Sequence, residues 1–486
     1  MPDIVLTTLN ARYRHAAFGL RCLLANLGAL ADRAMVLEFD LEKTPAEMAE
    51  AILKRAPQIV GIGVYIWNAE PTRKLLAILR QVRPEVILVL GGPEVSHETF
   101  TQPVTVLADY VIAGEGEVAF RELCQRLLAG ERRPTARLIQ AAPPALDALA
   151  APYPLYDARD IHERVIYVEA TRGCPFKCAF CLSALERGVR SFPLAPFLAE
   201  MERLLQRGVR QFKFVDRSFN VHLTTACAIL DFFYAHHVPG LFLHFEMVPD
   251  RFPEALRSSI QRFPPGSIQL EIGLQSLNPE VLARIDRPRK IAQAAANLAW
   301  LRRETGVHLH TDLIVGLPGE DLASFARGFD RLAALDPHEI QVGILKRLRG
   351  APLQRHVEPF RMVFDPEPPY ELLGNAQIDF MTLRRLKRFA RYWDLIGNSG
   401  RFPTTRTCLL HEGSPFTRFM ALSDWIYATS GQTHQIALPR LCDLVETGLV
   451  QALGLSAELA AVTVQADRQY LSQKKAGKSR QARHEG

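Results

Sequence analysis

The sequence predicts an α/β protein with an open parallel sheet at its N-terminus, a second domain of repeated strand–helix units and a helical C-terminal domain. Apolar runs alternate with segments of helical periodicity up to about residue 350, a pattern typical of parallel sheets. From residue 359 onward only helical spacing remains. A chain of 486 residues exceeds one hydrophobic core, and its 48% hydrophobic and 23% charged residues are ordinary for a soluble globular protein.

Five apolar runs define the expected strands of the first domain, residues 1–133. They are Ile4–Leu6, Met35–Phe39, Ile59–Val64, Val86–Leu90 and Tyr110–Ile112. The intervening helical periodicity indicates βαβ units and a Rossmann-like sheet, whose ligand crevice lies at the carboxyl ends of the strands. Small, glycine or polar residues follow four of these strands and are the candidates for ligand contact: Asn10, Tyr13, Tyr65, Trp67, Asn68, Gly91, Gly92, Pro93, Gly114, Glu115, Gly116 and Glu117.

The ligand of this first sheet is not a nucleotide of a familiar kind. No Gly-x-Gly-x-x-Gly follows the first strand, so a dinucleotide is poorly supported, and no Walker A sequence indicates a nucleoside triphosphate.

A proline-rich segment at 134–163 is expected to be an extended linker, because five prolines interrupt any helical or strand period. The second domain, residues 164–358, contains six strand–helix repeats. Their strands are expected at Val165–Ala170, Gln211–Val215, Leu241–Met247, Ser267–Leu274, Leu309–Val315 and Ile340–Leu345. Polar or glycine residues at the carboxyl ends of barrel strands indicate an active site. The candidates are Asp216, Asn220, Glu246, Gln275, Ser276, Asp312 and Gly316.

Three cysteines lie within eight residues directly after the first strand of this domain: Cys174, Cys178 and Cys181. A CxxxCxxC loop can bind three irons of a [4Fe–4S] cube and leaves the fourth iron without a protein ligand. A zinc site and three ordinary buried thiols are the alternatives. Zinc normally takes four Cys or His ligands, and no second cysteine pair or nearby His-x-x-x-His completes such a set.

The remaining cysteines are scattered and do not form a disulfide framework, which suits a reducing compartment. The first residues lack a basic region followed by a long apolar run, and no stretch reaches the roughly eighteen apolar residues that span a bilayer. A cytoplasmic location without a membrane span is therefore expected.

The cysteine spacing, with Phe180 just before the last cysteine, resembles the radical S-adenosylmethionine (SAM) superfamily. In that family SAM chelates the open iron, and an electron from the cluster cleaves SAM to a 5′-deoxyadenosyl radical. The Gly-Gly-Pro and Gly-Glu-Gly-Glu segments upstream resemble the cobalamin-binding domain of the B12-dependent radical SAM enzymes. The resemblance implies a Rossmann-like cobalamin-binding domain, a partial (β/α)₆ barrel and three cofactors: a [4Fe–4S] cluster, SAM and cobalamin.

The resemblance also divides the roles of the candidate residues. The three cysteines would hold the cluster, Phe180 would cover it and touch adenine, and the segment Asp216–Asn220, including Ser218, would lie at the SAM amino group. Segments around Gln275, Ser276 and Gly316 would lie near ribose and adenine. For each polar residue, a hydrogen bond in the barrel interior or a helix cap is an open alternative. For the first domain, a Rossmann-like sheet that binds no cobalamin is another.

No Asp-x-His-x-x-Gly sequence is present, so no protein histidine is expected on cobalt. By resemblance, the residues nearest the lower face of cobalamin would come from the segment 65–68.

Residues 359–466 are expected to form helices. One amphipathic segment, containing Leu383, Leu386 and Trp393, carries several arginines and a lysine on its other face. A solvated surface is favoured there over a phosphate or RNA contact. The region resembles a helical C-terminal extension of unknown role in one subgroup of B12-binding radical SAM proteins and is expected to close the active site from one side. Residues 467–486 are expected to be a basic, disordered tail.

The function expected from this resemblance is hydrogen abstraction from a substrate carbon, with methyl transfer from methylcobalamin. Radical cyclisation or rearrangement without methyl transfer is the first alternative. An RNA-binding or RNA-modifying Fe–S protein is the second, although no RNA-binding module is recognisable and a nucleic-acid partner is not expected. A degenerate protein with a structural cluster is the third. The expected partners are a small-molecule or peptide substrate of unknown identity and a reducing electron donor of the flavodoxin or ferredoxin type.

Overall fold

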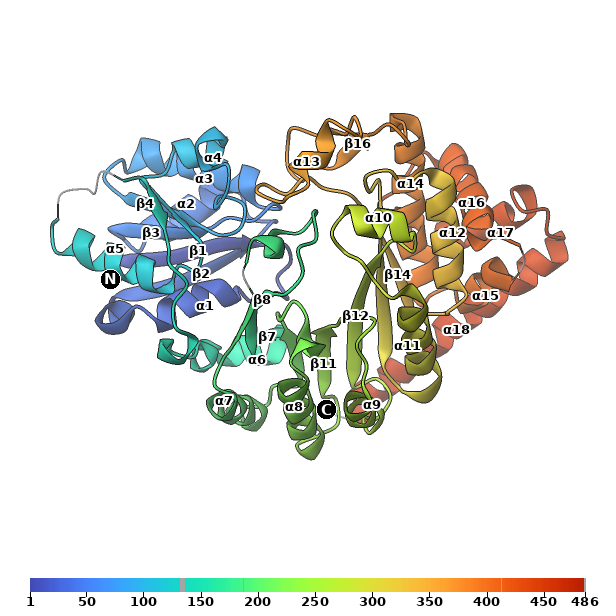
Figure 1. The fold of residues 1–486 in the computed structure, drawn as a ribbon, viewed down its shortest axis with the longest axis horizontal. Coiled ribbons are helices and arrows are strands. Elements are labelled where there is room, and N and C mark those ends of the chain that lie inside the picture. Colours follow the sequence, from blue (N-terminus) through green and yellow to red (C-terminus); the bar gives the residue numbers. More distant parts are fainter. Residues whose placement is uncertain (132–135, 187, 412, 485–486) are drawn as a thin grey trace. The chain divides into compact units, whose positions relative to one another are not determined.

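A six-stranded parallel sheet forms the N-terminal part of the protein (Figure 1) in the computed structural model, which describes residues 1–131, 136–186, 188–411 and 413–484. The strand order is β2-β1-β3-β4-β5-β6. The strands are β1 (Ile4–Asn10), β2 (Ala34–Asp40), β3 (Ile59–Gly63), β4 (Ile87–Gly91), β5 (Tyr110–Ala113) and β6 (Leu138–Gln140). The first five confirm the strands predicted from the apolar runs.

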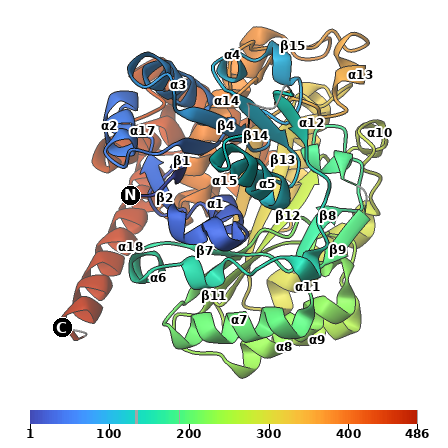
Figure 2. The same cartoon turned by 90° about the vertical axis from the view of Figure 1, so that its left-hand side faces the viewer.

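Helices cover both faces of this sheet (Figure 2). They are α1 (Phe18–Ala25), α2 (Pro45–Leu53), α3 (Ala69–Val82), α4 (Pro103–Val106) and α5 (Glu117–Leu128). Alternate residues of each buried strand point to opposite faces, so the sheet separates two apolar cores. Helices α2, α3 and α4 bury their apolar sides in one core, and α1 and α5 in the other.

The segment expected to be an extended linker contains a strand, an α-helix and, between them, two 3₁₀ turns at Leu146–Ala148 and Tyr153–Leu155. Strand β6 pairs in parallel with β5 and adds the sixth strand to the N-terminal sheet. Helix α6 (Ala158–Glu163) begins with a capping box in which the Asp157 carboxylate accepts from the backbone N–H of Asp160. The expectation of an extended linker was therefore wrong for these stretches. Residues 134 and 135 of that segment lie outside the described residues.

The described chain divides into two units. The first comprises Met1–Glu246, Arg347–Pro352 and Asp365–Tyr370, and the second comprises Met247–Lys346, Leu353–Phe364 and Glu371–Gly486, masked positions aside. The rest of the first unit contains β7 (Ile166–Val168), β8 (Thr171–Cys174), β9 (Gly188–Ser191), α7 (Leu194–Gln206), β10 (Gln211–Phe214), α8 (Leu223–Ala235) and β11 (Phe242–Glu246). Strands β7, β10 and β11 pair in parallel, whereas β8 and β9 form a short antiparallel pair.

The second unit continues the strand–helix alternation. Its elements are α9 (Glu254–Gln261), β12 (Ile268–Gln275), α10 (Pro279–Arg284), α11 (Ile291–Glu304), β13 (His308–Val315), α12 (Leu322–Ala333), β14 (Glu339–Ile344), α13 (Gln354–Val357), β15 (Val363–Phe364) and β16 (Leu372–Gly374). Strands β12, β13 and β14 are parallel neighbours. The six strands predicted for the second domain are thus confirmed, three in each unit.

The C-terminal region is helical, as predicted. It contains α14 (Phe380–Trp393), a π-helical turn (Asp394–Asn398), α15 (Pro403–His411), α16 (Pro415–Ser430), α17 (Leu438–Gln451) and α18 (Ala457–His484). The side-chain amide of Asn398 donates to the carbonyl of Ile340 and accepts from its backbone N–H, both at 2.9 Å. This pair of hydrogen bonds satisfies the open edge of β14 as a neighbouring strand would.

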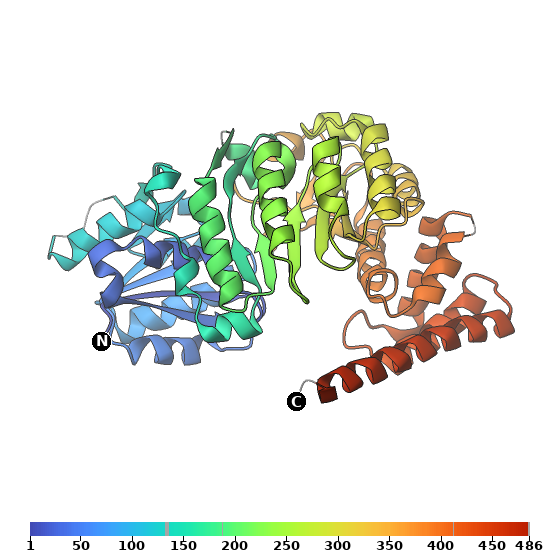
Figure 3. The ribbon, with the colours of Figure 1, turned by 90° about the horizontal axis from the view of Figure 1, so that it is seen from below.

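Helix α18 continues through the segment that was expected to be disordered from residue 467 (Figure 3). Asp467 is fully buried and accepts hydrogen bonds from the backbone N–H groups of Thr404 and Thr405 and from the Thr405 hydroxyl. These bonds satisfy the first turn of α15, so the expectation of a disordered tail from residue 467 was wrong at this position. Among the described residues, no helix is both long and apolar enough to cross a membrane.

The Asp467 anchor predicts that Asp467→Ala lowers the free energy of unfolding by about 2 kcal/mol, because it leaves buried donors at the start of α15 without acceptors. The measurement is a urea unfolding curve followed by circular dichroism. Asp443→Ala is the matched control, since Asp443 on α17 is exposed and pairs with Arg468 on the surface. The control should change the free energy by less than about 0.5 kcal/mol, and equal losses for the two variants would contradict the anchor.

Candidate functional site

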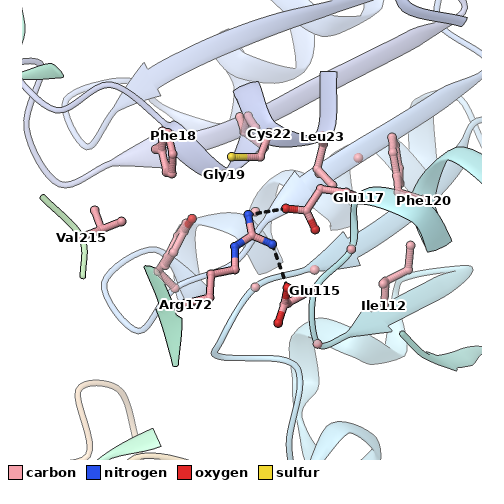
Figure 4. Close-up of a pocket in the computed structure, with 18 of the residues that line it drawn as sticks. Phe18, Gly19, Cys22, Leu23, Ile112, Glu115, Glu117, Phe120, Arg172 and Val215 are labelled. Atoms are coloured by element: carbon pink, nitrogen blue, oxygen red, sulfur yellow. Dashed lines mark hydrogen bonds and ion pairs between the residues drawn. The ribbon is translucent and has the colours of Figure 1, made fainter. Parts of the chain in front are cut away.

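A cavity of about 360 Å³ lies at the carboxyl ends of the N-terminal strands. The loops after β3, β4 and β5, the start of α1, and residues next to and within β8 line it (Figure 4). Eight of its lining residues are glycines: Gly19, Gly61, Gly63, Gly91, Gly92, Gly114, Gly116 and Gly173. A wall this poor in Cβ atoms lets a large flat ligand approach the backbone closely.

Two of these glycines also adopt conformations that other residues avoid. Gly92 has φ +106°, and a Cβ there would lie 2.5 Å from the carbonyl oxygen of Val64. Gly173, between Arg172 and Cys174, has φ +93°, and its Cβ would lie 2.2 Å from the carbonyl oxygen of Gly188. Both positions therefore require glycine.

Seven of the predicted cobalamin-contact residues line the cavity, and five do not. Those at its wall are Tyr65, Gly91, Gly92, Gly114, Glu115, Gly116 and Glu117. Asn10, Tyr13, Trp67, Asn68 and Pro93 are not part of the wall.

The described contacts explain where four of these five side chains point. Asn68 is fully buried and holds its own loop, accepting from the Tyr65 backbone N–H and donating to Thr8 and to the carbonyls of Leu9 and Gly63. Asn10 donates to Glu38 at 2.6 Å, and Tyr13 donates to Glu163. Trp67 is 45% exposed, stacks on Tyr65 at 4.5 Å and donates to the Leu9 carbonyl.

The cysteine loop begins at the end of β8. Cys178 is 3% exposed, Cys174 and Cys181 are half-buried, and none forms a disulfide. Burial raises the pKa of the Cys181 thiol, and the nearby charge of Arg217 opposes this shift. Among the residues that the structure describes, no three His, Cys, Asp or Glu side chains meet around a single metal ion. A [4Fe–4S] cube needs no such meeting point, because each thiolate binds a different iron, so three thiols on one loop that form no disulfide fit this group.

Asp216, predicted to contact SAM, holds the start of the cysteine loop. Its side chain is 1% exposed, and its two carboxylate oxygens accept from the Thr171 hydroxyl at 2.6 Å and the Ala170 backbone N–H at 3.1 Å. Burial raises its pKa to about 6, and these hydrogen bonds oppose the shift. The described contacts give Asp216 a structural part in fixing the loop.

The other predicted SAM residues of the first unit lie around the cysteines or at the ends of β10 and β11. The Ser218 hydroxyl is 3.6 Å from the Cys174 sulfur. The Glu246 carboxylate, at the end of β11, is 3.7 Å from the Arg217 guanidinium. Asn220 is buried, and Phe180 is half-buried beside Cys181.

In the second unit, Gln275 and Ser276 follow β12. Gln275 has φ +71° and folds its amide back over Gly273. The Ser276 hydroxyl donates to Glu320 at 2.5 Å, and burial raises the pKa of this carboxyl to about 7. Glu320 directly follows the Gly316–Gly319 loop, so Ser276 acts locally as a partner for this buried carboxyl.

Asp312 of β13 belongs to a buried ionic group. His310 lies 3.1 Å from both Asp312 and Glu339, and His308 lies 2.8 Å from Glu339. Burial lowers the pKa of His310, but hydrogen bonds to Asp312 and Glu339 outweigh it and raise the pKa to about 10. Burial raises the pKa of Glu339, and the two histidines outweigh this effect and lower it to about 2. His310 is therefore a buried cation at neutral pH.

Sequence reasoning found Glu115 and Glu117 but missed four other charged residues of the cavity wall. Glu169, Arg172, Glu186 and Arg217 all line it. Arg172 lies only two residues before Cys174 in the sequence, and this proximity to the cysteine motif was the signal that could have identified it.

A second missed group clamps the loop after β4. The Tyr370 hydroxyl donates to the buried Glu94 carboxylate at 2.6 Å, and Arg349 lies 3.3 Å from Glu94 and covers the Tyr370 ring at 4.7 Å. Burial raises the pKa of Glu94, and its two partners oppose this shift. The two short returns of the chain to the first unit thus fasten the loop that carries Gly91 and Gly92.

The basic face of α14 is mostly engaged within the protein. Arg385 pairs with Asp424, Lys387 with Glu371, and Arg391 donates to the Thr433 carbonyl. Arg388 covers the Tyr427 ring at 4.3 Å. These contacts leave less free charge than the sequence pattern indicated for a phosphate-bearing partner.

Three family models match successive parts of the chain. Residues 4–124 match the B12 binding domain, and residues 168–332 match the radical SAM superfamily. Residues 358–442 match a family described as protein of unknown function (DUF4080). The first two matches cover the cavity loops and the cysteine motif.

Curated relatives are similar over the same region. The 2-(S-pantetheinyl)-carbapenam-3-carboxylate methyltransferase of Streptantibioticus cattleyicolor is 28% identical over 63% of this chain and 49% of its own length. The cobalamin-dependent radical SAM methyltransferase TokK of Streptomyces tokunonensis is 26% identical over 63% of this chain and 49% of its own length. The chain thus spans about half the length of these relatives.

A solved structure shares the fold. The radical SAM methyltransferase TsrM from Kitasatospora setae, solved with cobalamin and a [4Fe–4S] cluster, aligns over 86% of this chain and 98% of its own with a TM-score of 0.60 and 17% identity. Fold and matches together define an α/β protein that combines a B12 binding domain with a radical SAM domain. The chain contains these two domains in succession, and its C-terminal region adds the match to the family of unknown function.

The close approach at Gly92 predicts that Gly92→Ala destabilises the protein by at least about 1 kcal/mol more than Gly130→Ala, because the added methyl forces the Val64 backbone to move. Gly130 is the matched control, since it also has positive φ, +80°, but open space around its Cβ position. Urea midpoints measure the difference. Equal losses would show that only the backbone conformation matters at position 92.

The pKa shifts of the β13 cluster predict a pH window of stability. His310 binds its proton more tightly in the folded protein, about 10 against an ordinary value of 6.5, so its stabilisation is complete below pH 6.5 and is lost as pH rises through 10. His310→Gln should remove this alkaline loss and destabilise the protein at pH 7 by about 3 kcal/mol, because Asp312 loses its partner His310 and Glu339 keeps only His308. Unfolding midpoints from pH 6 to pH 10 test this expectation.

The exposed His434 on the loop after α16 provides the control, and His434→Gln should keep the wild-type pH profile. An unchanged alkaline slope in His310→Gln would contradict the assignment.

Proposed function

We propose that the protein is a cobalamin-dependent radical SAM methyltransferase that methylates a carbon of a small-molecule or peptide substrate. One observation carries the proposal: the glycine-lined cavity of the B12-binding domain also has Thr171, Arg172 and Gly173 in its wall, which lead directly into Cys174. Cobalamin bound in that cavity would lie beside the loop that holds the cluster. The names of the curated relatives support methylation as the outcome.

When bound, the cluster would supply the electron for cleavage of SAM and so for hydrogen abstraction from the substrate, and cobalamin would carry the methyl group that a second SAM supplies. The residues of this chain position and shield these groups. Cys174, Cys178 and Cys181 would each bind one iron. Asp216 would keep the loop in place through Thr171 and Ala170. Phe180 would cover the cluster, and a flavodoxin or ferredoxin would supply the electron.

The remaining predicted SAM residues keep their proposed places. Ser218 and Asn220 follow the second strand of the barrel repeats, where the amino group of SAM would lie. Gln275 and Ser276 at the end of the fourth strand and Gly316 after the fifth would lie near ribose and adenine. Glu246 at the end of β11 and Asp312 within β13 remain candidates for SAM contact. At Asp216 and Ser276 the described hydrogen bonds favour a structural role over direct SAM contact.

The proposal predicts two products from SAM in the absence of any substrate. Anaerobic protein loaded with cluster and cobalamin, given SAM and titanium(III) citrate, should form 5′-deoxyadenosine by slow uncoupled cleavage and one S-adenosylhomocysteine per bound cobalamin. Liquid chromatography with mass spectrometry measures both. Formation of 5′-deoxyadenosine without S-adenosylhomocysteine would favour radical cyclisation or rearrangement.

Cysteine variants separate the cluster from the fold in this assay. Cys178→Ala should reduce 5′-deoxyadenosine to background, because the cube loses one of its three ligands. Cys442→Ala is the matched control, since Cys442 is a buried cysteine of α17 far along the chain from the motif. Undiminished SAM cleavage in Cys178→Ala would overturn the assignment of the cysteine loop.

A further inference from the structure

One arginine joins the cysteine loop to the B12-binding domain. Arg172 lies on β8, two residues before Cys174, and its guanidinium reaches three carboxylates, two of which, Glu115 and Glu117, are seen in Figure 4. Its Nε is 3.0 Å from Glu169, its Nη1 is 2.8 Å from Glu115, and its Nη2 is 2.7 Å from Glu117. Each of the three guanidinium nitrogens thus pairs with a different carboxylate.

The partners of Arg172 belong to parts of the chain that would hold different cofactors. Glu115 and Glu117 lie in and at the end of the loop after β5, and this loop forms part of the cavity wall through Gly114 and Gly116. Glu169 lies between β7 and β8, directly before the residues that Asp216 fixes. The Arg172 side chain therefore connects the loop after β5, which would contact cobalamin, with β8, the strand that ends at the first cysteine.

This cluster of charges is shielded from water. The Arg172 side chain is 12% exposed, and those of Glu117 and Glu169 are 6% and 13% exposed. Burial raises the pKa of Glu169 to about 7 even though Arg172 opposes the shift. Arg190 on β9 also pairs with Glu115 and donates to the Pro144 carbonyl, but it reaches neither Glu117 nor Glu169. Without Arg172, two of the three carboxylates would lose their basic partner.

We propose that Arg172 is a positioning residue that couples cobalamin binding to the [4Fe–4S] loop, so that each cofactor changes the affinity of the other. A lysine could not replace it, because only a guanidinium offers nitrogens to three carboxylates in a fixed fork. If the cluster changes the affinity for cobalamin by a given factor, cobalamin changes the affinity for the cluster by the same factor. The coupling can therefore be measured from the dissociation constant of cobalamin alone. The inference rests on the proposed function, because it requires that both cofactors bind.

The experiment is a cycle of four dissociation constants for hydroxocobalamin, measured by spectrophotometric titration. Wild-type protein and Arg172→Gln are each titrated with the cluster reconstituted and with iron removed by a chelator. In the wild type, removal of the cluster should raise the dissociation constant about tenfold. In Arg172→Gln the affinity should be weaker in both forms, and removal of the cluster should change it less than about twofold, because the connection is broken.

Arg80→Gln is the matched control. Arg80 of α3 forms a similarly shielded pair with Asp109 at 2.5 Å in the same sheet domain, outside the cavity wall. Its coupling factor should equal that of the wild type. If Arg172→Gln does not fold, Arg172→Lys is titrated in the same way and should lose most of the coupling.

The outcomes separate the two proposals. An unchanged coupling factor in Arg172→Gln or Arg172→Lys, or an equal loss in Arg80→Gln, overturns the role of Arg172 and leaves the proposed function standing. Wild-type protein that binds no hydroxocobalamin overturns the proposed function, and the role of Arg172 falls with it. Loss of coupling confined to the Arg172 variants supports the inference.

Discussion

In an open parallel sheet covered by helices on both faces, ligands bind at the loops that follow the carboxyl ends of the strands, and this constraint organises the first unit. The loops after β3, β4 and β5 meet at one edge of the N-terminal sheet, and the strand β8 that leads into the cysteines reaches the same cavity. Residues separated by more than 100 positions in the sequence therefore share one wall. The glycines of these loops follow from the same constraint, because a flat ligand at the edge of a sheet must contact backbone.

The cavity and its surroundings concentrate ionisable groups that burial would disfavour in isolation. Glu169, Asp216 and Glu94 are carboxyls with raised pKa values, and each has hydrogen-bond donors or an arginine that oppose the shift. Such groups are common at functional sites. Here their described partners are loop backbone, hydroxyls and arginines, so they fix the shapes of the loops.

The fold was predictable where the signal is local and repeated. Strand-like apolar runs recur between segments of helical periodicity, so eleven strands were located from the sequence alone. Strand β6 has only three residues among prolines, and its stability comes from pairing with β5. The extent of α18 was missed because Asp467 acts through Thr404 and Thr405, more than 60 positions earlier in the chain. No pattern along the sequence reports such a contact.

The candidate site divides in the same way. The cysteine motif and the glycines are local signals, and glycine has no side chain whose direction could be misjudged. Polar side chains were predicted on loops that follow the strands, but their directions depend on tertiary partners, so Asn68 and Asp216 hold loops and Tyr13 points to Glu163. Arg172 was overlooked because two of its partners, Glu115 and Glu117, lie 55 or more positions upstream.

The central claim is that this chain holds an iron–sulfur cube and a corrin together, and one preparation tests it most directly. Protein made in cobalamin-fed cells and purified without oxygen should show corrin bands and broad Fe–S absorption, with about four irons and four acid-labile sulfides per chain. Both absorptions should persist through gel filtration. A colourless protein that contains neither iron and sulfide nor cobalt after reconstitution would contradict the account.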